Sequence, residues 1–257
     1  MPQHPPKADA VLVTGGARRV GAAIVRALAA DGWVVFLHYH RSRREAEALA
    51  EELSRKGGGC IPVPADLARI EEVIGLVPRC LEHGATLKCL INNASAFECD
   101  SIGSLTPESW ARHLAPNLTA PAFLAKSFAE HAEPERDNVI INMLDQKVRN
   151  LNPDFFSYTI SKIGLLGLTE TLALALAPAV RVCAVAPGIT LPSGAQSEEQ
   201  FARAWRAPPL GRSSSPEEIV LAIRFILATP SMTGNILYLD GGESLTKRPR
   251  DVAFEIE

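Results

Sequence analysis

The stretch Val-Ile-Ile-Asn-Met-Leu-Asp at residues 139–145 is followed, thirteen positions after Asp145, by Tyr-Thr-Ile-Ser-Lys at residues 158–162. The first run predicts a buried strand, and the second opens an apolar segment that predicts a helix to about residue 177. Four-residue spacing places Tyr158 and Lys162 on one helix face. A nearby cation favours the phenolate, so we expect Lys162 to lower the pKa of Tyr158 toward neutrality. The unit thus predicts a proton-donating tyrosine beside a strand end, with a merely solvated helix face as the alternative.

Similar units run through the whole chain. Apolar strand-like runs alternate with helical patterns from residue 9 onward. This alternation is typical of repeated βαβ units that build a parallel sheet with helices on both faces. We expect strands at 10–14, 34–37, 61–64, 87–91, 139–143 and 180–185, and a last strand and turn at 235–242. We expect helices at 22–30 and 43–56, one ending near 82, and others at 106–131, 157–177 and from 215.

A glycine-rich turn, Gly-Gly-Ala-Arg-Arg-Val-Gly at residues 15–21, joins the first strand to the first helix. Such a turn lets backbone N–H groups and the helix N-terminus meet a pyrophosphate. A plain strand-to-helix turn remains the alternative, because glycine-rich turns are common. The turn therefore indicates a nucleotide site only together with further features.

The second strand supplies one of those features. It ends in His38-Tyr39-His40-Arg41-Ser42, and the first acidic residue after it is Glu45. A site for NAD places an acid here against the ribose 2′-hydroxyl, whereas an arginine accommodates the 2′-phosphate of NADP. The sequence therefore predicts NADPH as the cofactor, although the two histidines are equally consistent with polar side chains at a strand end.

These features together resemble the short-chain dehydrogenase/reductase family, and the resemblance covers nearly the whole chain. In the family's Thr-Gly-x-x-x-Gly-x-Gly motif the middle glycine is replaced by Arg19 here, which resembles the pteridine reductase or dihydromonapterin reductase branch. The His-Tyr-His-Arg-Ser run and Phe97 resemble the same branch. The resemblance implies an α/β fold with one doubly wound, seven-stranded parallel sheet of the Rossmann type, in the order 3-2-1-4-5-6-7.

The resemblance also implies roles for individual residues. It implies catalytic roles for Asn117, Asp145, Tyr158 and Lys162, and substrate contacts for Phe97, Asp145 and Tyr158. It implies cofactor contacts for Gly15, Arg19, Val20, His38, Tyr39, His40, Arg41, Ser42, Asp66, Leu67, Asn93, Ala94, Ser95, Tyr158, Lys162, Pro187, Gly188 and Ile189. The chain departs from the family where Asn-Asn-Ala-Gly becomes Asn-Asn-Ala-Ser, and where Thr190 comes one residue early. Asp66 also suits a helix cap, and Phe97 also suits a core position.

Asp145 is the most informative departure, because most members of the family carry serine there. A serine hydroxyl donates to a carbonyl oxygen, whereas an ionised carboxylate only accepts and repels the negative charge that develops there. A pterin ring offers N–H donors and, in the C=N bond under reduction, a nitrogen that must gain a proton. We therefore predict NADPH-dependent reduction of a pterin. A 3-oxoacyl or sugar carbonyl reductase and a non-catalytic NADPH-binding sensor or structural subunit are the alternatives, as is an Asp145 that merely caps its loop.

Composition bounds these hypotheses. The chain has 257 residues, a formal net charge of −3 and 47% hydrophobic residues, which suits one domain and gives no basic footprint for nucleic acid. Five scattered cysteines suggest neither a metal site nor a disulfide framework. We expect a disordered leader at 1–8, a catalytic domain at 9–243 with a substrate-loop insert at 191–214, and a tail at 244–257 that crosses a subunit boundary. No apolar run near the start suits a signal peptide or membrane span, so we expect a cytoplasmic protein, and a homotetramer or homodimer in keeping with the family.

Overall fold

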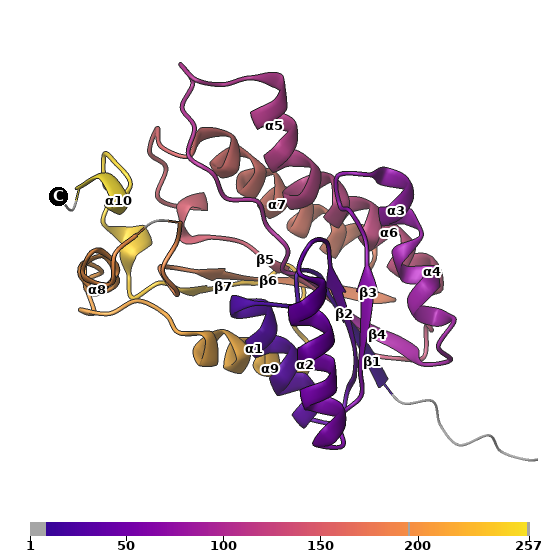
Figure 1. Cartoon of the computed structure of the whole chain (residues 1–257). Coiled ribbons are helices and arrows are strands. Elements are labelled where there is room, and N and C mark those ends of the chain that lie inside the picture. The colour runs from indigo at the N-terminus through magenta and orange to yellow at the C-terminus, as the bar shows by residue number, and fades with distance from the viewer. Residues whose placement is uncertain (1–8, 195, 256–257) are drawn as a thin grey trace, which may run out of the picture.

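The structure is a computed structural model that describes residues 9–194 and 196–255 (Figure 1). The expected leader at 1–8 lies outside the described residues. The seven strands are β1 (Asp9–Val13), β2 (Val34–Tyr39), β3 (Cys60–Pro64), β4 (Thr86–Asn92), β5 (Asn138–Met143), β6 (Val180–Pro187) and β7 (Ile236–Leu239). They pair in the order β3-β2-β1-β4-β5-β6-β7, and every pair is parallel. The predicted fold class and strand order are confirmed.

Helices cover both faces of this sheet (Figure 1). The longer ones are α1 (Arg19–Ala30), α2 (Arg43–Arg55), α5 (Pro107–Leu114), α6 (Ala120–His131), α7 (Phe156–Ala175), α8 (Glu198–Arg206) and α9 (Pro216–Leu227); α3 (Ile70–Ile74), α4 (Leu76–Leu81) and α10 (Val252–Glu255) are short. One core cluster packs α1, α2 and α9 against the sheet, and a second packs α3, α4 and α6 against its other face. Strands buried on both faces explain why their sequences are continuous apolar runs rather than alternating ones.

Two predicted helices are interrupted. The one expected to end near residue 82 is divided at Gly75 into α3 and α4. Pro78 accounts for the break, because it has no N–H to donate to the carbonyl of Ile74. The helix predicted at 106–131 begins with a capping box between Thr106 and Ser109, then contains a π-helical turn, η1 (Ala115–Thr119), between α5 and α6. That turn carries Asn117 and includes Pro116, whose missing N–H favours a local change of helix type.

The remaining short elements lie at the carboxyl edge of the sheet. They are two 3₁₀ turns, η2 (Gln146–Val148) after β5 and η3 (Glu243–Leu245) after β7, and these two turns contact each other. The chain beyond η3 runs back to α8 and ends in α10 (Figure 1). The described part of the predicted tail, residues 244–255, thus packs on its own chain, next to the segment that follows β5.

Candidate active site

The site is built where β5 ends and α7 begins. The Tyr158 hydroxyl, on the first turn of α7, donates to Oδ2 of Asp145 at 2.7 Å. Oδ1 of Asp145 accepts from the backbone N–H of Lys147 at 2.8 Å, which closes η2. Asp145 therefore does cap its loop, and the same carboxylate holds the tyrosine. The structure brings the two predicted residues into direct contact.

The expectation that Lys162 lowers the pKa of Tyr158 is wrong for this arrangement. Burial, and then the charge of Asp145, raise the pKa of Tyr158 well above its usual value. Burial also raises the pKa of Asp145, against the hydrogen bonds from Lys147 and Tyr158 that lower it. A phenol that donates to a carboxylate keeps its proton, so the pair holds a proton ready for a basic acceptor. The four-residue rule correctly placed Lys162, but it could not foresee the closer anion.

Lys162 is buried and donates to the backbone oxygen of Met143 at 2.8 Å, while its Nζ lies 5.7 Å from the centre of the Tyr158 ring. Burial lowers the pKa of Lys162 to about 8. The ammonium therefore lies close enough to compensate a charge on the tyrosine without being hydrogen-bonded to it. Met143 fixes its position.

Asn117 lies on the π-helical turn η1, whose geometry points its side chain at two segments. Its Oδ1 accepts from the N–H of Ala96 at 2.8 Å, and its Nδ2 donates to the Ala96 oxygen and to Oγ of Ser161, each at 3.0 Å. Asn117 therefore joins the loop after β4 to α7. Through Ser161, one residue before Lys162, Asn117 contacts the turn of α7 that carries Lys162.

An aromatic group covers one side of the tyrosine. The ring of Phe97 meets Tyr158 edge-on at 4.7 Å between centroids and stacks on Phe155 at 4.5 Å with an interplanar angle of 16°. Phe97 is 42% exposed, so its ring is available as a wall of the site. Sequence reasoning missed Phe155, because nothing in its neighbourhood distinguishes it from a core residue.

Phe155 stands at the start of α7 with a left-handed backbone, φ 52°. That conformation costs a non-glycine residue about 1 to 3 kcal/mol, so its surroundings must hold it there. Asp100 supplies part of this support, because its main-chain oxygen accepts from Phe156 N–H and its carboxylate accepts from the N–H and hydroxyl of Ser157. Nδ1 of His113, on α5, lies 2.7 Å from the Ser157 hydroxyl. This buried cluster caps the helix that carries Tyr158, and no sequence motif predicted it.

The glycine turn forms the other half of the site. A Cβ on Gly21 would collide with the carbonyl oxygen of Gly15, and Gly15 itself has a φ of +62°. The Asn93 side chain donates to the oxygens of Thr14 and Gly15, and the Thr14 hydroxyl accepts from the N–H groups of Asn93 and Ala94. The first turn of α1 carries no acidic residue. Close backbone packing and a helix N-terminus without an acid suit a bound pyrophosphate.

The His38 side chain, on β2, holds this turn through a hydrogen bond to its main chain. Its Nδ1 accepts from the N–H of Gly15 at 3.0 Å, so its proton resides on Nε2, which lies 3.1 Å from the oxygen of Ala65. Burial lowers the pKa of His38 to about 4, which keeps the ring neutral. His38 thus fixes the main chain just after β1 and just after β3. The direct contact with a cofactor that was predicted for this ring would have to compete with these two bonds.

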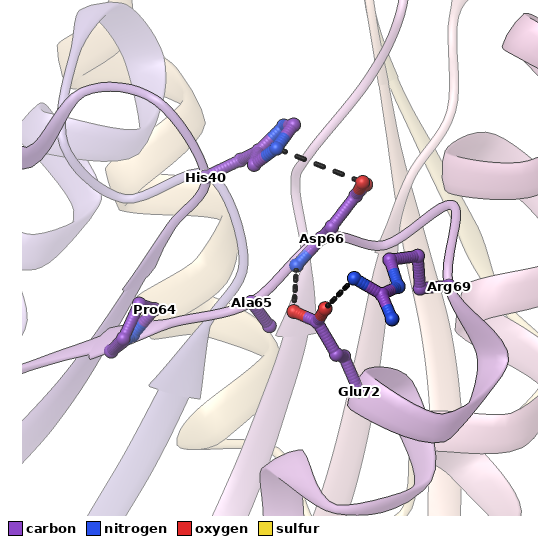
Figure 2. Close-up of a pocket in the computed structure, with 6 residues that line it drawn as sticks. All are labelled: His40, Pro64, Ala65, Asp66, Arg69 and Glu72. Carbon is purple, nitrogen blue, oxygen red and sulfur yellow. Dashed lines mark hydrogen bonds and ion pairs between the residues drawn. The ribbon is translucent and has the colours of Figure 1, made fainter.

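The residues predicted to contact the cofactor at the ends of β2 and β3 fall into an exposed group and a buried group. His40 and Arg41 are exposed, and Nε2 of His40 lies 3.7 Å from the Asp66 carboxylate in a small pocket shown in Figure 2. Asp66 also caps the turn before α3 by accepting from Ala68 N–H at 2.9 Å. The side chains of Tyr39 and Leu67 are instead buried in the two core clusters.

Arg19 adopts a position that the sequence did not indicate. Its guanidinium donates to the backbone oxygen of Pro192 at 2.7 Å and approaches that of Leu191 at 3.4 Å. The arginine expected beside the phosphates therefore reaches the start of the substrate-loop insert. Val20 follows it and packs partly against the core.

Ser95, in the loop after β4, is exposed.

The last part of the candidate site is formed by the residues at the end of β6. Gly188 donates to the oxygen of Leu239, and a Cβ on it would collide with the Ser213 hydroxyl and the backbone of Asp240. Pro187 and Ile189 are partly exposed on either side. The Thr190 hydroxyl bonds the oxygen of Gly188 at 3.0 Å, so this threonine closes the turn.

The described residues hold neither a cluster of metal-ligating side chains nor a helix suited to a membrane. Within residues 9–194 and 196–255, His, Cys, Asp and Glu side chains form no group of three that could hold a metal ion. Among the helices of the same residues, none combines the length and apolar character that crossing a membrane requires.

Comparisons with known proteins agree with this geometry. The family described as short chain dehydrogenase matches residues 9–202. Pteridine reductase 1 of Leishmania tarentolae is 33% identical, over 94% of this chain and 98% of that protein, and a 3-oxoacyl-[acyl-carrier-protein] reductase of Synechocystis sp. is 32% identical, over 91% and 96%. The crystal structure of FolM alternative dihydrofolate reductase 1 from Brucella suis in complex with NADP has 43% identity and a TM-score of 0.89, over 92% of this chain and 95% of that one. The chain therefore belongs to the short chain dehydrogenase family of oxidoreductases.

Proposed function

We propose that this protein is an NADPH-dependent reductase that converts a dihydropterin to a tetrahydropterin. The observation that carries the proposal is the 2.7 Å hydrogen bond from the Tyr158 hydroxyl to the Asp145 carboxylate. A carboxylate accepts hydrogen bonds from a 2-amino pyrimidine ring, whereas it repels the oxyanion that forms when a ketone is reduced. The kinship with a pteridine reductase and with FolM structures bound to NADP supports the same assignment.

The substrate would bind beside Tyr158, against the Phe97 ring. The edge-on contact of Phe97 with Tyr158, at 4.7 Å, places a flat apolar surface next to the proton donor. An aromatic face of this kind favours a flat heterocycle over an aliphatic chain. Phe97 would therefore orient the ring, and Asp145 would fix its polar edge.

NADPH supplies the hydride. The Gly15 turn and the N-terminus of α1 would bind its pyrophosphate, and Arg41 with the Ser42 hydroxyl would bind the 2′-phosphate through charge-assisted hydrogen bonds. Within the described chain the Ser42 side chain caps no backbone group of α2, so its hydroxyl is available for this contact.

Tyr158 would give its proton to the ring nitrogen of the reduced C=N bond. The phenolate that remains would lie beside Asp145, and the raised pKa of Asp145 would let this carboxylate take up a proton from water and pass it to the phenolate. The Lys162 ammonium, 5.7 Å from the centre of the tyrosine ring, offsets the transient charge. A positioned proton donor contributes on the order of 10²- to 10⁴-fold to such a step.

The test is NADPH oxidation by the purified protein with dihydrobiopterin, dihydromonapterin, dihydrofolate, an acetoacetyl thioester and no substrate, measured side by side. We expect turnover with at least one of the pterin substrates and little with the thioester. Turnover of the thioester alone would replace the proposal with a 3-oxoacyl or sugar carbonyl reductase, which the 32% identity to a 3-oxoacyl-[acyl-carrier-protein] reductase favours. NADPH binding without turnover of any substrate would favour the sensor or structural subunit.

We further propose that the protein is a cytoplasmic homotetramer or homodimer. The apolar run at 165–168 is largely used within the chain, because Leu165, Leu166 and Leu168 belong to a small core cluster. Other apolar side chains on α6 and α7 are exposed, namely Phe123, Ile160 and Leu174. Exposed apolar side chains on neighbouring helices favour contact with a second copy. Light scattering at micromolar concentration should return a dimer or tetramer mass, and a monomer mass would contradict this.

A further inference from the structure

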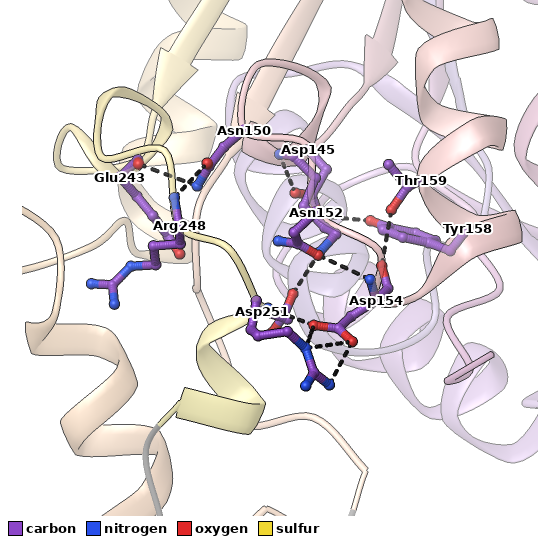
Figure 3. A network of polar contacts seen from close by, with 11 residues as sticks. Asp145, Asn150, Asn152, Asp154, Tyr158, Thr159, Glu243, Arg248 and Asp251 are labelled. Atoms are coloured by element: carbon purple, nitrogen blue, oxygen red, sulfur yellow. Dashed lines mark hydrogen bonds and ion pairs between the residues drawn. The ribbon is translucent and has the colours of Figure 1, made fainter. Parts of the chain in front are cut away.

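The active-site loop, residues 145–155, is held by a distant part of the chain that we term the C-terminal strap, residues 247–254 (Figure 3). Nζ of Lys147 lies 2.6 Å from Oδ2 of Asp251, and both side chains are largely buried. The same lysine donates its backbone N–H to Asp145. Asp251 thus fixes the residue that fixes the carboxylate against Tyr158.

A second ion pair holds the other end of the loop. The Arg250 guanidinium makes a bidentate contact with the Asp154 carboxylate, with Nε to Oδ2 and Nη2 to Oδ1 each at 2.8 Å. The backbone N–H of Asp251 donates to the same carboxylate at 2.8 Å. Asp154 immediately precedes Phe155, so these bonds fix the chain next to the residue with the left-handed backbone.

Residues of the strap also donate hydrogen bonds to the middle of the loop. The backbone N–H of Arg248 donates to Oδ1 of Asn150 at 3.1 Å, and Nζ of Lys247 donates to the oxygen of Arg149 at 3.1 Å. At the end of the strap the Phe254 ring lies 5.8 Å from the Phe155 ring. The strap therefore follows the loop from η2 to the start of α7.

The two sides of the site depend on these contacts in different ways. One series runs from Asp251 through Lys147 to Asp145, which bonds the tyrosine. The other runs from Arg250 through Asp154 to Phe155, whose ring stacks on Phe97. A left-handed phenylalanine persists only where its surroundings determine it. The strap is part of those surroundings.

We propose that Asp251 and Arg250 are positioning residues of the active site: Asp251 sets the Asp145–Tyr158 pair, and Arg250 sets the aromatic wall formed by Phe155 and Phe97. The inference rests on the proposed function only for the choice of a pterin as assay substrate. It gives the strap a role in each half of substrate recognition, although the strap touches neither Asp145 nor Phe97 through any contact described above.

The experiment compares Asp251→Asn and Arg250→Gln with the control Arg224→Gln. Arg224, on α9, makes the same bidentate contact, at 2.7 and 2.8 Å, with Asp31, the residue that follows α1, away from the loop. We expect kcat for the pterin to fall on the order of tenfold to a hundredfold in Asp251→Asn, because small misplacements of reacting groups have effects of this size. We expect Arg250→Gln chiefly to raise KM. NADPH affinity should stay unchanged in all three, and Asp251→Glu should restore most of the lost rate.

The dependence of kcat on pH in Asp251→Asn distinguishes a role of Asp251 in positioning Asp145 from a general loosening of the protein. Asp145 is faced by Tyr158, Lys147, Lys162 and Glu243. Without the Asp251 charge, Lys147 acts more strongly on Asp145, so the acid limb of the kcat profile should move to lower pH. A loosened protein would lose rate at every pH with an unmoved profile, which would overturn the role of Asp251.

Further arms keep the test independent of the assay substrate and of folding. If the wild type reduces only the thioester, the pterin proposal fails and the same comparison is made with the thioester, since Tyr158 serves both. Amide exchange at Lys147 should be faster in Asp251→Asn and unchanged in Arg224→Gln, whatever the activity. Arg250 is half exposed, so Arg250→Gln should fold even if Asp251→Asn does not. Kinetics and exchange equal to those of Arg224→Gln would sink the inference.

Discussion

The cofactor half of the site, residues 14–66, and the substrate half, formed by the active-site loop and the C-terminal strap, are held by different kinds of contact. The cofactor half relies on main-chain bonds around Gly15, supported by the neutral His38 ring. The substrate half relies on ion pairs between residues about a hundred positions apart, such as Lys147 with Asp251. Main-chain contacts depend little on single charges, whereas a buried ion pair fails when one partner is lost. We therefore expect substrate turnover to be far more sensitive to substitution than cofactor binding.

Asp145→Ser should show the largest difference between the two halves: a large loss of substrate turnover with no loss of cofactor binding. The change removes the carboxylate that accepts the hydrogen bond of the Tyr158 hydroxyl and would hold the polar edge of the pterin, so pterin turnover should fall on the order of a hundredfold or more. NADPH binding, measured by fluorescence titration, should be unchanged. Because serine restores a hydroxyl donor, any weak activity on small ketones should rise or stay level.

Tyr158→Phe is the matched comparison for that variant. It should depress pterin and ketone reduction together, because both substrates need the phenolic proton. A wild type that reduces ketones, loses that activity in Asp145→Ser and never turns over a pterin would show that Asp145 has a different role.

A smaller effect, confined to the cofactor half, is expected for Arg41→Ala. We expect NADPH to bind the wild type at least about tenfold more tightly than NADH, through the charge-assisted contact of Arg41 with a 2′-phosphate. The variant should lose most of this preference while kcat at saturating NADPH stays the same. Equal affinities of the wild type for the two cofactors would refute the assignment.

Asp100→Ala should weaken the start of α7 alone. The carboxylate accepts from the backbone and hydroxyl of Ser157, so its loss resembles the loss of a helix cap, which costs about 0.5 to 2 kcal/mol. The control is Ser215→Ala, which removes the cap of α9. Thermal melts should show similar losses for both, but only Asp100→Ala should lower kcat. Equal kcat in the two variants would mean that the cap does not position Tyr158.

The smallest effect should appear as the pH rises from about 4.5, the ordinary pKa of a glutamic acid, to about 8. Burial, and then the charges of Asp145 and Asp251, raise the pKa of Glu243 to about 8. Its folded-state pKa lies above the unfolded one, so its contribution to stability is present at acid pH and is lost as the pH rises through 8. Glu243→Gln should flatten the fall in melting temperature between pH 6 and 9, whereas Glu135→Gln, at an exposed position, should not. A fall as steep as that of the wild type would place the ionised Glu243 in contact with water.

The same contrast explains what could be predicted from the sequence. The glycine turn and the place of Asp145 and Tyr158 between β5 and α7 follow from short motifs, because strand, turn and helix lie next to each other in the chain, and the sheet order follows from the family resemblance. The hydrogen bond between Tyr158 and Asp145 was not foreseen. The strap could not be predicted, since Asp251 and Arg250 form no motif with partners about a hundred residues away. The π-helical turn at Asn117 and the contact of Arg19 with residues 191–192 were missed for a related reason, because each depends on tertiary packing.

His38 adds a consequence for the order in which the molecule comes apart. One neutral ring joins Gly15, just after β1, to Ala65, just after β3, and its pKa is lowered to about 4. Unfolded chains take up that proton near pH 6.5, so its stabilising effect is present above that pH and disappears as the pH falls toward 4. As the pH falls from 6.5 toward 4, the edge formed by β2 and β3 should therefore open before the strap, because the Asp154 carboxylate that pairs with Arg250 has a pKa lowered from 3.8 and is protonated only in stronger acid. As the pH rises toward 8, the side of the site that holds Glu243 should loosen first. The two halves of the site would then act as separate units of local unfolding, each with its own direction of pH sensitivity.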